Sequence, residues 1–405
     1  MTSFDTSPTL NVWRALLALA VVFVMLATTG WTALRNQRDH TPLQLSLAAW
    51  ADGRLDGRPL PDPRSTPARL AAFFASLSDT QRTGLVHRYP LVVGNMNGAP
   101  VRLRYRANHL ALGQARETER QRMRDRRLSP GGQHEAGRRM HRLTALMEPG
   151  RHILAFDPDG SGRVAEVFGS LDRAERISIV VPGVDTDLLT FQRTNRKYTA
   201  PAGMAESLYT AERAASPGTR TAVIAWADYT APGGIGVEAA TVTRAAQGAT
   251  RLNALVRALP GTAPVSLFCH SYGSVLCGVA ARVLPDRVTD IAVAGSPGMR
   301  AEKASQLRSS AQVWAMRDAD DWIEDVPYME LGGLGHGADP VSRAFGARVL
   351  SAGGAHGHAG YFEPGTESLR NFAEIGVGAY DSVRCADEAD ACTTDMPADV
   401  GSGRA

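Results

Sequence analysis

Cysteine is scarce in this sequence, with four residues in a chain of 405. Cys269 and Cys277 lie eight residues apart around a serine-containing segment, and Cys385 and Cys392 lie near the C-terminus. This spacing excludes a zinc cluster. Cys385 and Cys392 stand in the polar stretch CADEADAC, where they either form a short disulfide in an oxidising compartment or remain free thiols.

Neither sign of charge is in large excess. The chain has 44 basic and 41 acidic residues, which gives a formal net charge of +3. A protein that binds nucleic acid needs a concentrated basic surface, so this balance argues against nucleic acid as a partner. The arginine-rich segment at residues 116–127 interleaves both signs, which is typical of a solvated helix face. The sequence also contains no internal repeat.

A long uncharged apolar run lies close to the N-terminus. Residues 15–34 contain no charged side chain, and Arg14 and Arg35 flank them. A helix of twenty apolar residues spans the hydrocarbon core of a bilayer. A cleavable signal peptide is the competing interpretation, but its best cleavage site, near Ala27, is poor. We therefore predict an N-terminal region, residues 1–40, with an uncleaved single-pass anchor in the cell membrane; secretion after signal cleavage is the alternative.

The next part of the chain, residues 41–150, is predicted to be a linker followed by a helical segment. Thr41 to Pro63 is rich in proline and glycine and is interpreted as the linker. Thr66 followed by Pro67 has the pattern of a helix start, and apolar residues follow at helical spacing. A second helical stretch is predicted from Val101 to Met147.

From residue 151 to residue 382 the pattern becomes that of an α/β core. A β-hairpin is predicted around the turn at residues 159–162, and strands and helices alternate after it. Near-continuous apolar strands separated by helices indicate a mostly parallel sheet covered on both faces. The predicted strands are Ile177–Gly183, Thr221–Tyr229, Val265–Ser271, Asp290–Gly298 and Ala311–Arg317, and the predicted helices are Met204–Ala215 and Val237–Leu259. The acidic tail, residues 383–405, is predicted to be disordered.

The stretch VSLFCHSYGSVLCGVAARV, residues 265–283, carries the clearest chemical signal. An apolar strand stops at Ser271, and a small-residue helix follows directly. A nucleophile elbow has this form, because a strained turn lifts the serine hydroxyl out at the end of a strand and needs small residues two positions before and after it. Gly273 meets this need, whereas Cys269 stands where glycine is usual. We predict that Ser271 is a catalytic nucleophile; a serine that merely caps the helix is the alternative.

A serine hydroxyl needs a base, and the base needs a group that orients it. In proteins with such a nucleophile elbow, the acid and then the histidine follow the serine along the chain. The histidines that follow the elbow are His336, His356 and His358. We prefer His358, in the glycine-rich AHGHAGYF, with His356 as the closer rival. The carboxylates just beyond the strand at 311–317 are Asp318, Asp320 and Asp321, and spacing alone does not separate them.

The oxyanion of a tetrahedral intermediate needs hydrogen-bond donors. We predict the backbone N–H groups of Tyr272, the residue after the nucleophile, and of Val184, in the loop PGVDTD. An ordinary strand-to-helix turn is the simpler interpretation of that loop. GGIGVE, residues 233–238, lacks the spacing of a dinucleotide loop, and GHGADP, residues 335–340, has too few metal ligands. We therefore predict no cofactor and no metal.

From about residue 77 to residue 378 the sequence resembles a family of actinobacterial α/β-hydrolases known only as a domain of unknown function. The shared blocks include VVPGVDTDL, VIAWADYTAP, CHSYGS, DDWIEDVP and GHAGYFEPGTESLRN. The elbow of these relatives usually reads GHSYGS, so Cys269 is a departure. The resemblance implies the α/β-hydrolase fold and places the acid at Asp321, in DWI, and the base at His358, in GHAGYF. It does not imply a substrate.

These features together predict a membrane-tethered serine hydrolase that forms an acyl-enzyme at Ser271. The expected substrate is a small-molecule or lipid-like ester, because pockets of this kind are mostly apolar. One alternative is an acyltransferase of the cell envelope, in which an alcohol or a sugar replaces water. The other is a catalytically silent scaffold or binding module with the α/β-hydrolase fold, which an elbow distorted at Cys269 would favour.

Overall fold

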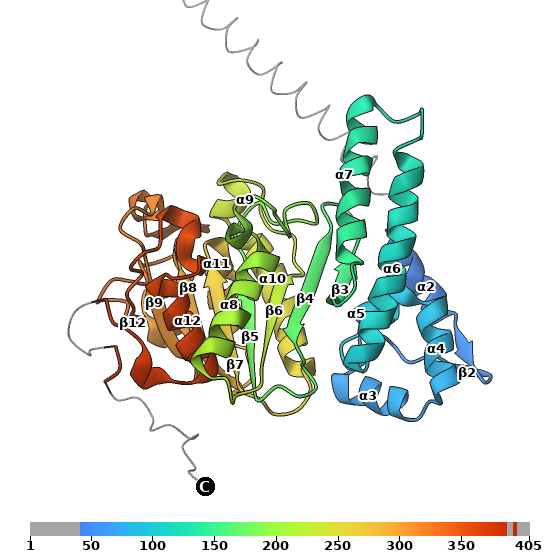
Figure 1. Ribbon diagram of the computed structural model, residues 1–405, viewed down its shortest axis with the longest axis horizontal. Coiled ribbons are helices and arrows are strands. Elements are labelled where there is room, and N and C mark those ends of the chain that lie inside the picture. The colour runs from blue at the N-terminus through green and yellow to red at the C-terminus, as the bar shows by residue number, and fades with distance from the viewer. Residues whose placement is uncertain (1–40, 387–391, 395–405) are drawn as a thin grey trace, which may run out of the picture.

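The structure, a computed structural model, describes residues 41–386 and 392–394 (Figure 1). Within these ranges no helix has both the length and the apolar character needed to cross a membrane. The anchor predicted at residues 15–34 lies outside the described residues. A helical N-terminal part stands beside a larger part that is built on a central sheet (Figure 1).

The central sheet has eight strands in the order β12-β9-β8-β7-β5-β6-β4-β3. Strands β5 to β9 and β12 run parallel to their neighbours of this set, whereas β4 is antiparallel to both β3 and β6. Helices cover both faces, and this mostly parallel arrangement confirms the predicted α/β-hydrolase fold. The strands are β3 (His152–Asp157), β4 (Arg163–Gly169), β5 (Arg176–Val181), β6 (Thr221–Ala227), β7 (Val265–His270), β8 (Val288–Ala294), β9 (Gln312–Met316) and β12 (Arg348–Val349).

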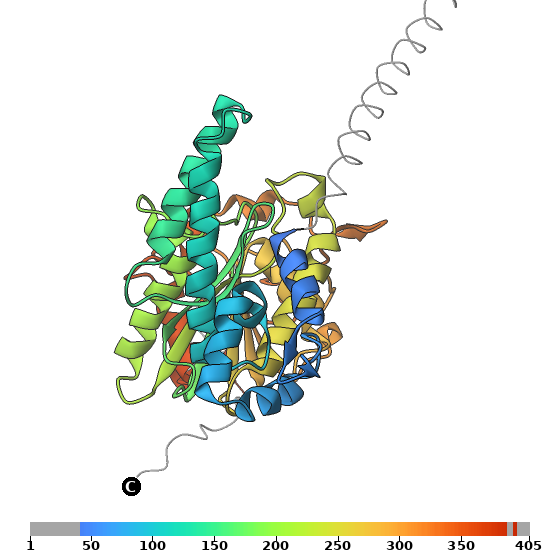
Figure 2. The same ribbon diagram turned by 90° about the vertical axis from the view of Figure 1, so that its right-hand side faces the viewer.

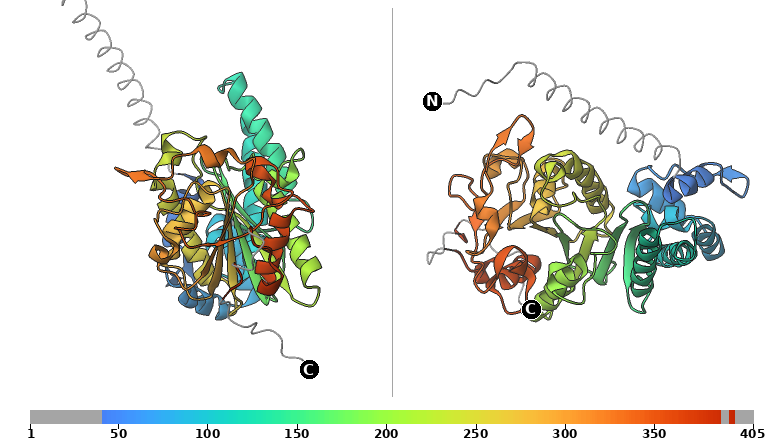
Figure 3. Two further views of the ribbon diagram at one scale, coloured as in Figure 1. Left: turned by 90° about the vertical axis from the view of Figure 1, so that its left-hand side faces the viewer. Right: turned by 90° about the horizontal axis from the view of Figure 1, so that it is seen from above.

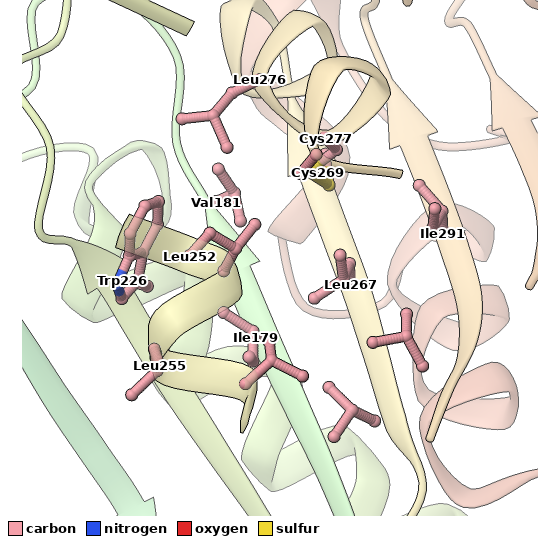
Figure 4. Close-up of a cluster of buried hydrophobic side chains, with 14 of the residues drawn as sticks. Ile179, Val181, Trp226, Leu252, Leu255, Leu267, Cys269, Leu276, Cys277 and Ile291 are labelled. Carbon is pink, nitrogen blue, oxygen red and sulfur yellow. A yellow bond between two sulfur atoms is a disulfide. The ribbon is translucent and has the colours of Figure 1, made fainter. Parts of the chain in front are cut away.

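Two pairs of helices flank the sheet. Helices α8 (Pro201–Ala215) and α12 (Glu367–Val377) lie on one face, and α10 (Thr243–Ala258) and α11 (Tyr272–Ala281) lie on the other (Figure 3). A separate apolar core fills the space under each pair. Figure 4 shows the core on the α10 side, where side chains of that helix meet those of the sheet. The two cores hold the strands rigidly, so the loops at the ends of the strands start from fixed positions.

The N-terminal part consists of helices with an apolar core of their own. Helices α6 and α7 form a pair that lies along the edge strand β3 (Figure 1). The buried side chain of Asn108 donates to the carbonyl oxygen of Ile153 at 2.9 Å, so this pair covers an edge that would otherwise be open. The helices are α2 (Pro42–Ala51), α3 (Pro67–Ala75), α4 (Asp79–Arg88), α5 (Pro90–Asn95), α6 (Val101–Arg122) and α7 (Pro130–Leu146).

The prediction that Thr41 to Pro63 is a linker is wrong. Thr41 and Gln44 form a capping box that starts α2, and the two short strands β1 (Arg54–Leu55) and β2 (Arg58–Pro59) follow it. Trp50 is fully buried, and its indole nitrogen donates to the carbonyl oxygen of Pro61 at 2.7 Å. This one large side chain gives the segment a core to fold on, despite its proline and glycine content.

Two helices predicted as continuous are interrupted. The stretch from Val101 to Met147 is divided into α6 and α7, because the Ser129 side chain caps a new helix that has proline at its first position. The stretch from Val237 to Leu259 is divided into α9 (Val237–Ala240) and α10. The remaining short elements are β10 (Glu330–Leu331), β11 (Leu334–Gly335) and the 3₁₀ helices η1 (Lys197–Thr199), η2 (Ala304–Leu307), η3 (Trp322–Asp325), η4 (Gly357–Phe362) and η5 (Tyr380–Ser382).

The described residues of the C-terminal tail are attached to the sheet edge. Cys385 forms a β-bridge with Leu350 and a disulfide with Cys392, a pairing that the sequence left open. The guanidinium of Arg348 donates to the carbonyl oxygen of Cys392 at 2.8 Å. The prediction of disorder is therefore wrong for residues 383–386 and 392–394, and the rest of the predicted tail lies outside the described residues.

Candidate active site

Ser271 stands at the sharp turn between β7 and α11. Its backbone has φ +54° and ψ −129°, a conformation that a non-glycine residue adopts only when its surroundings impose it. The Ser271 N–H donates to the carbonyl oxygen of Ala294, in the neighbouring strand β8, at 3.0 Å. A Cβ at Gly273 would overlap the carbonyl oxygen of Val181, so only glycine lets α11 pass so close to β5. The local geometry is that of a nucleophile elbow.

Cys269, two residues before Ser271, forms a disulfide with Cys277. The bond joins β7, two residues before Ser271, to α11, six residues after it (Figure 4). Both cysteines are buried in the core. The sequence did not predict this pairing. The elbow therefore has a covalent link between its strand and its helix.

The structure brings Ser271, His358 and Asp321 together. The Nε2 atom of His358 lies 2.8 Å from the Ser271 hydroxyl oxygen, and its Nδ1 atom lies 2.8 Å from Oδ1 of Asp321. His358 is on η4, and Asp321 caps η3, where its Oδ1 also accepts the N–H of Ile323 at 3.0 Å. A neutral imidazole in this chain carries its proton on Nδ1, so Nε2 is free to accept the serine proton.

The carboxylate of Asp321 is kept ionised by its surroundings. Burial alone would raise its pKa, but hydrogen bonds from His358 and Tyr361 outweigh burial and lower the pKa below the usual range. The Tyr361 hydroxyl donates to Oδ2 of Asp321 at 2.5 Å. Gly295, at φ +56°, faces this pair, since a Cβ there would lie 2.9 Å from Oδ2 of Asp321. The sequence did not predict these contacts of Tyr361 and Gly295 with Asp321.

The rival candidates have other contacts. Asp318 Oδ2 accepts the N–H of Gly357 at 2.8 Å, and so fixes the loop that carries His358. Asp320 and His356 are exposed. The ring of His336 is 2.6 Å from the carbonyl oxygen of Ala239, so His336 holds its loop against α9. None of these side chains makes a hydrogen bond to Ser271 in the described part of the chain.

His270, directly before the nucleophile, is a further side chain whose placement the sequence did not predict. It is buried, and burial together with the nearby His358 lowers its pKa to about 4. Its Nε2 lies 2.5 Å from the backbone carbonyl oxygen of His358, and because a carbonyl only accepts, this nitrogen carries the proton. His270 thus holds the backbone of the residue whose side chain contacts Ser271.

The two predicted oxyanion donors lie beside the nucleophile. Val184 and Tyr272 both line the cavity that contains Ser271. Among the described residues, neither backbone N–H has a hydrogen-bond acceptor in the protein. The Tyr229 hydroxyl donates to the carbonyl oxygen of Pro182 at 2.7 Å and so fixes the loop that carries Val184. Two unpaired N–H groups beside a hydroxyl that lines the same cavity are the arrangement that an oxyanion requires.

The cavity at Ser271 has a volume of about 430 Å³, which is the size of a small-molecule site. Its walls are mostly apolar and come from the loop before α9, from η3 and from the β10–β11 hairpin. The lining includes Ile235, Ala239, Pro297, Trp322, Val326, Met329 and Leu334. Larger hollows of about 810 and 730 Å³ lie elsewhere and do not contact Ser271. In the described ranges no group of three or more His, Cys, Asp or Glu side chains could hold a metal ion.

Comparisons with known proteins agree with this fold. Residues 157–331 match a family described as alpha/beta hydrolase. Two uncharacterized proteins of Mycobacterium tuberculosis, MT2140 and Rv2079, are 26% identical over 387 residues, which cover 80% of this chain and 57% of each relative. The chain thus spans little more than half the length of these relatives.

Solved structures with similar folds include two hydrolases. One is a predicted CIB-like hydrolase from Thermoplasma acidophilum, with 15% identity and a TM-score of 0.36; the match covers 56% of this chain and 96% of that one. The other, from Xanthomonas campestris, is a serine hydrolase without a lid, with 15% identity and a TM-score of 0.35; the match covers 57% of this chain and 96% of that one.

Proposed function

We propose that this protein is a serine hydrolase that cleaves carboxylic esters through an acyl-enzyme. The observation that carries the proposal is the continuous hydrogen-bonded chain from Ser271 through His358 to Asp321, which opens into a mostly apolar cavity. A serine that only capped a helix would need neither an imidazole at 2.8 Å nor a carboxylate behind it.

In the proposed reaction, the Ser271 hydroxyl oxygen attacks the ester carbonyl carbon while Nε2 of His358 accepts the hydroxyl proton. Asp321 stabilises the imidazolium that forms. The N–H groups of Val184 and Tyr272 donate to the oxyanion. His358 then gives its proton to the leaving alcohol oxygen, and the C–O bond to the alcohol breaks. The same imidazole then takes a proton from water, whose oxygen attacks the acyl carbon. The bond from that carbon to the Ser271 oxygen breaks, and His358 returns the proton to this oxygen, so that the acid is released and Ser271 is restored.

The expected substrate is an ester with an apolar acyl part. Nearly all side chains that line the cavity are aliphatic, aromatic or proline, so an acyl chain or a ring gains free energy on leaving water. Among the described residues, no arginine or lysine lines the cavity to bind a negatively charged substrate. These features favour a lipid-like ester over a phosphorylated or peptide substrate.

The family and the location of the protein are part of the same proposal. The blocks around CHSYGS and GHAGYF support membership of the actinobacterial α/β-hydrolases of unknown function. The uncharged run at residues 15–34 supports a single-pass anchor in the cell membrane. An anchored enzyme with an apolar cavity would act on an ester of the membrane or of the surrounding envelope.

The test is labelling of the full chain, in mild detergent, with a fluorophosphonate probe that reacts with activated serines. We expect strong labelling of the wild type, no labelling of Ser271→Ala and greatly slowed labelling of His358→Ala. Ser266→Ala is the matched control, because this buried serine lies earlier in the same strand. Absence of labelling in the folded wild type, or labelling that persists in Ser271→Ala, would contradict the proposal.

The same preparation separates hydrolysis from acyl transfer. A series of chromogenic esters of increasing chain length, supplied with and without an added alcohol, gives free acid if water is the acceptor and a new ester if the alcohol replaces it. Folded wild-type protein that neither labels nor cleaves any of these esters would favour a silent scaffold.

A further inference from the structure

Exposed apolar side chains gather around the mouth of the Ser271 cavity. Of the seven large hydrophobic side chains that are strongly exposed in the described part of the chain, five lie here: Ile235, Val237, Trp322, Met329 and Leu334. Four of them also line the cavity, and Val237 follows Ile235 by two residues. Ile235 and Val237 are each 76% exposed. Single exposed apolar residues are ordinary, but a cluster of this kind marks a binding surface. We call these five residues the apolar rim.

The apolar rim comes from three separate segments of the chain. Ile235 lies in the loop before α9 and Val237 begins that helix. Trp322 begins η3. Met329 directly precedes β10, and Leu334 begins β11. This hairpin, in orange, and α9 project from the same end of the molecule (Figure 2). Independent segments that converge with the same chemistry form a surface, and the surface surrounds the opening through which a substrate reaches Ser271.

Two arginines near the apolar rim are each paired with a carboxylate. Arg300 forms an ion pair with Glu330 at 2.5 Å, and Arg244 forms one with Glu238 at 2.7 Å. Neither arginine offers a free charge to an acidic protein partner. Trp322 is the amphipathic residue type that is enriched at the interface between membrane and water. This combination suits an apolar surface with a polar boundary, which is what a lipid bilayer presents.

The position of the uncharged run at residues 15–34 points to the same partner. Six residues separate that run from Thr41, where the described chain begins, and a fully extended segment of this length reaches roughly 20 Å. The first described helix, α2, begins on the side of the molecule from which α9 and the β10–β11 hairpin project (Figure 2). A bilayer that held the run would therefore lie on the side of the molecule that carries the rim.

We propose that the apolar rim docks on the lipid bilayer, so that the cavity opens directly into the layer of acyl chains. A lipid-like ester would then pass from the membrane to Ser271 without crossing water. The docking depends on the rim and not on the chemistry at Ser271, so it can be tested whether or not the protein hydrolyses esters.

The test measures how close the rim lies to lipid in the full chain reconstituted into phosphatidylcholine vesicles. One variant, Leu334→Cys, carries an environment-sensitive NBD probe on the rim. The matched control, Val283→Cys, carries the same probe; Val283 is 51% exposed, against 53% for Leu334, but lies beyond the end of α11 that is distant from Ser271. Labelling is done without reductant, because the four native cysteines are paired in disulfides.

A side chain inserted ~5–10 Å into the boundary of the bilayer is within reach of doxyl-labelled lipids. We expect such lipids to quench the probe at position 334 about twofold or more and to leave the probe at 283 nearly unchanged. Equal quenching at both positions, or no quenching at 334 in protein that floats with the vesicles, would overturn the proposal and favour a protein partner. Failure of the protein to float with vesicles would overturn it as well. Ser271→Ala with the probe at 334 should behave like the parent, which separates docking from catalysis.

Discussion

The hydroxyl group of Tyr361 should be essential for fast catalysis, although it does not contact Ser271. It donates to Oδ2 of Asp321 at 2.5 Å, while His358 and the N–H of Ile323 share Oδ1. Tyr361→Phe removes this bond, and also the acceptor of the Asp318 N–H at 3.0 Å, but changes little else in shape. The Asp321 carboxylate then lacks the donor to Oδ2 and is free to rotate away from the imidazole.

The size of the effect follows from the type of bond. A hydrogen bond to a charged group contributes about 1.5–3 kcal/mol. If most of this is lost in the transition state, where His358 becomes an imidazolium, the reaction slows about 10- to 100-fold. The Tyr361 hydroxyl also helps to lower the pKa of Asp321. Its removal therefore raises that pKa, and the loss of activity on acidification should begin at a higher pH in the variant.

The assay is the second-order rate constant for fluorophosphonate labelling of Ser271, measured from pH 4 to pH 8 and divided by the fraction of folded protein. Tyr380→Phe is the matched control, because the Tyr380 hydroxyl donates at 2.9 Å to another buried carboxylate, Asp290, away from the site. We expect the control to lose stability but to label at the wild-type rate. Labelling of Tyr361→Phe within twofold of the wild type, with an unchanged pH profile, would refute the reasoning.

Two further predictions concern stability. Replacing Cys269 and Cys277 with alanine should lower the free energy of unfolding by about 2–3 kcal/mol, because the disulfide closes a short loop, while labelling of the folded protein falls only a few-fold. Denaturant titration without reductant measures the free energy of unfolding. A complete loss of labelling in folded protein would show instead that the disulfide is needed to shape the elbow. Burial raises the pKa of Glu212 to about 8. Between the pKa of this group in the unfolded chain and pH 8, the folded protein keeps a proton that the unfolded chain releases, so the free energy of unfolding falls as the pH rises. This decline amounts to up to ~1.4 kcal/mol per pH unit, and Glu212→Gln should remove it. The free energy of unfolding of both proteins is measured over this pH range, and curves that run parallel would show that Glu212 does not cause the decline.

The sequence predicted the sheet and the serine because both depend on local patterns. Buried parallel strands are continuously apolar, and an elbow must combine a strand, a serine and a small-residue helix within about 15 residues. The partners of Ser271 are different, because His358 is 87 residues away and several side chains fit the required order. Spacing left three acids open, and only the family resemblance selected Asp321.

The supporting residues could not be predicted, because their roles depend on contacts between distant segments. Tyr361 contacts a carboxylate 40 residues earlier in the chain, and Gly295 is required by side chains that reach it from two other loops. The linker error has a different cause. Thr41 and Gln44 form a recognisable capping box, but the proline and glycine content of the segment predicts a linker, and a lone Trp50 gives no repeating apolar pattern that would contradict it.

The disulfide of the elbow was within reach of sequence reasoning. Gly273 must be glycine because one face of α11 passes against the end of the sheet. Cys277 lies four residues later, so it occupies the same face one turn further along, where it meets β7 as the helix runs back along the strand. Cys269 is on that part of β7, and the two Cα atoms are 6.6 Å apart, within the range that a disulfide spans. Cysteine at position 269 therefore need not distort the turn. The Cys269 side chain, which glycine would lack, is accommodated because its sulfur is bonded to Cys277 of the helix. The hydroxyl of Ser271 still lies 2.8 Å from His358.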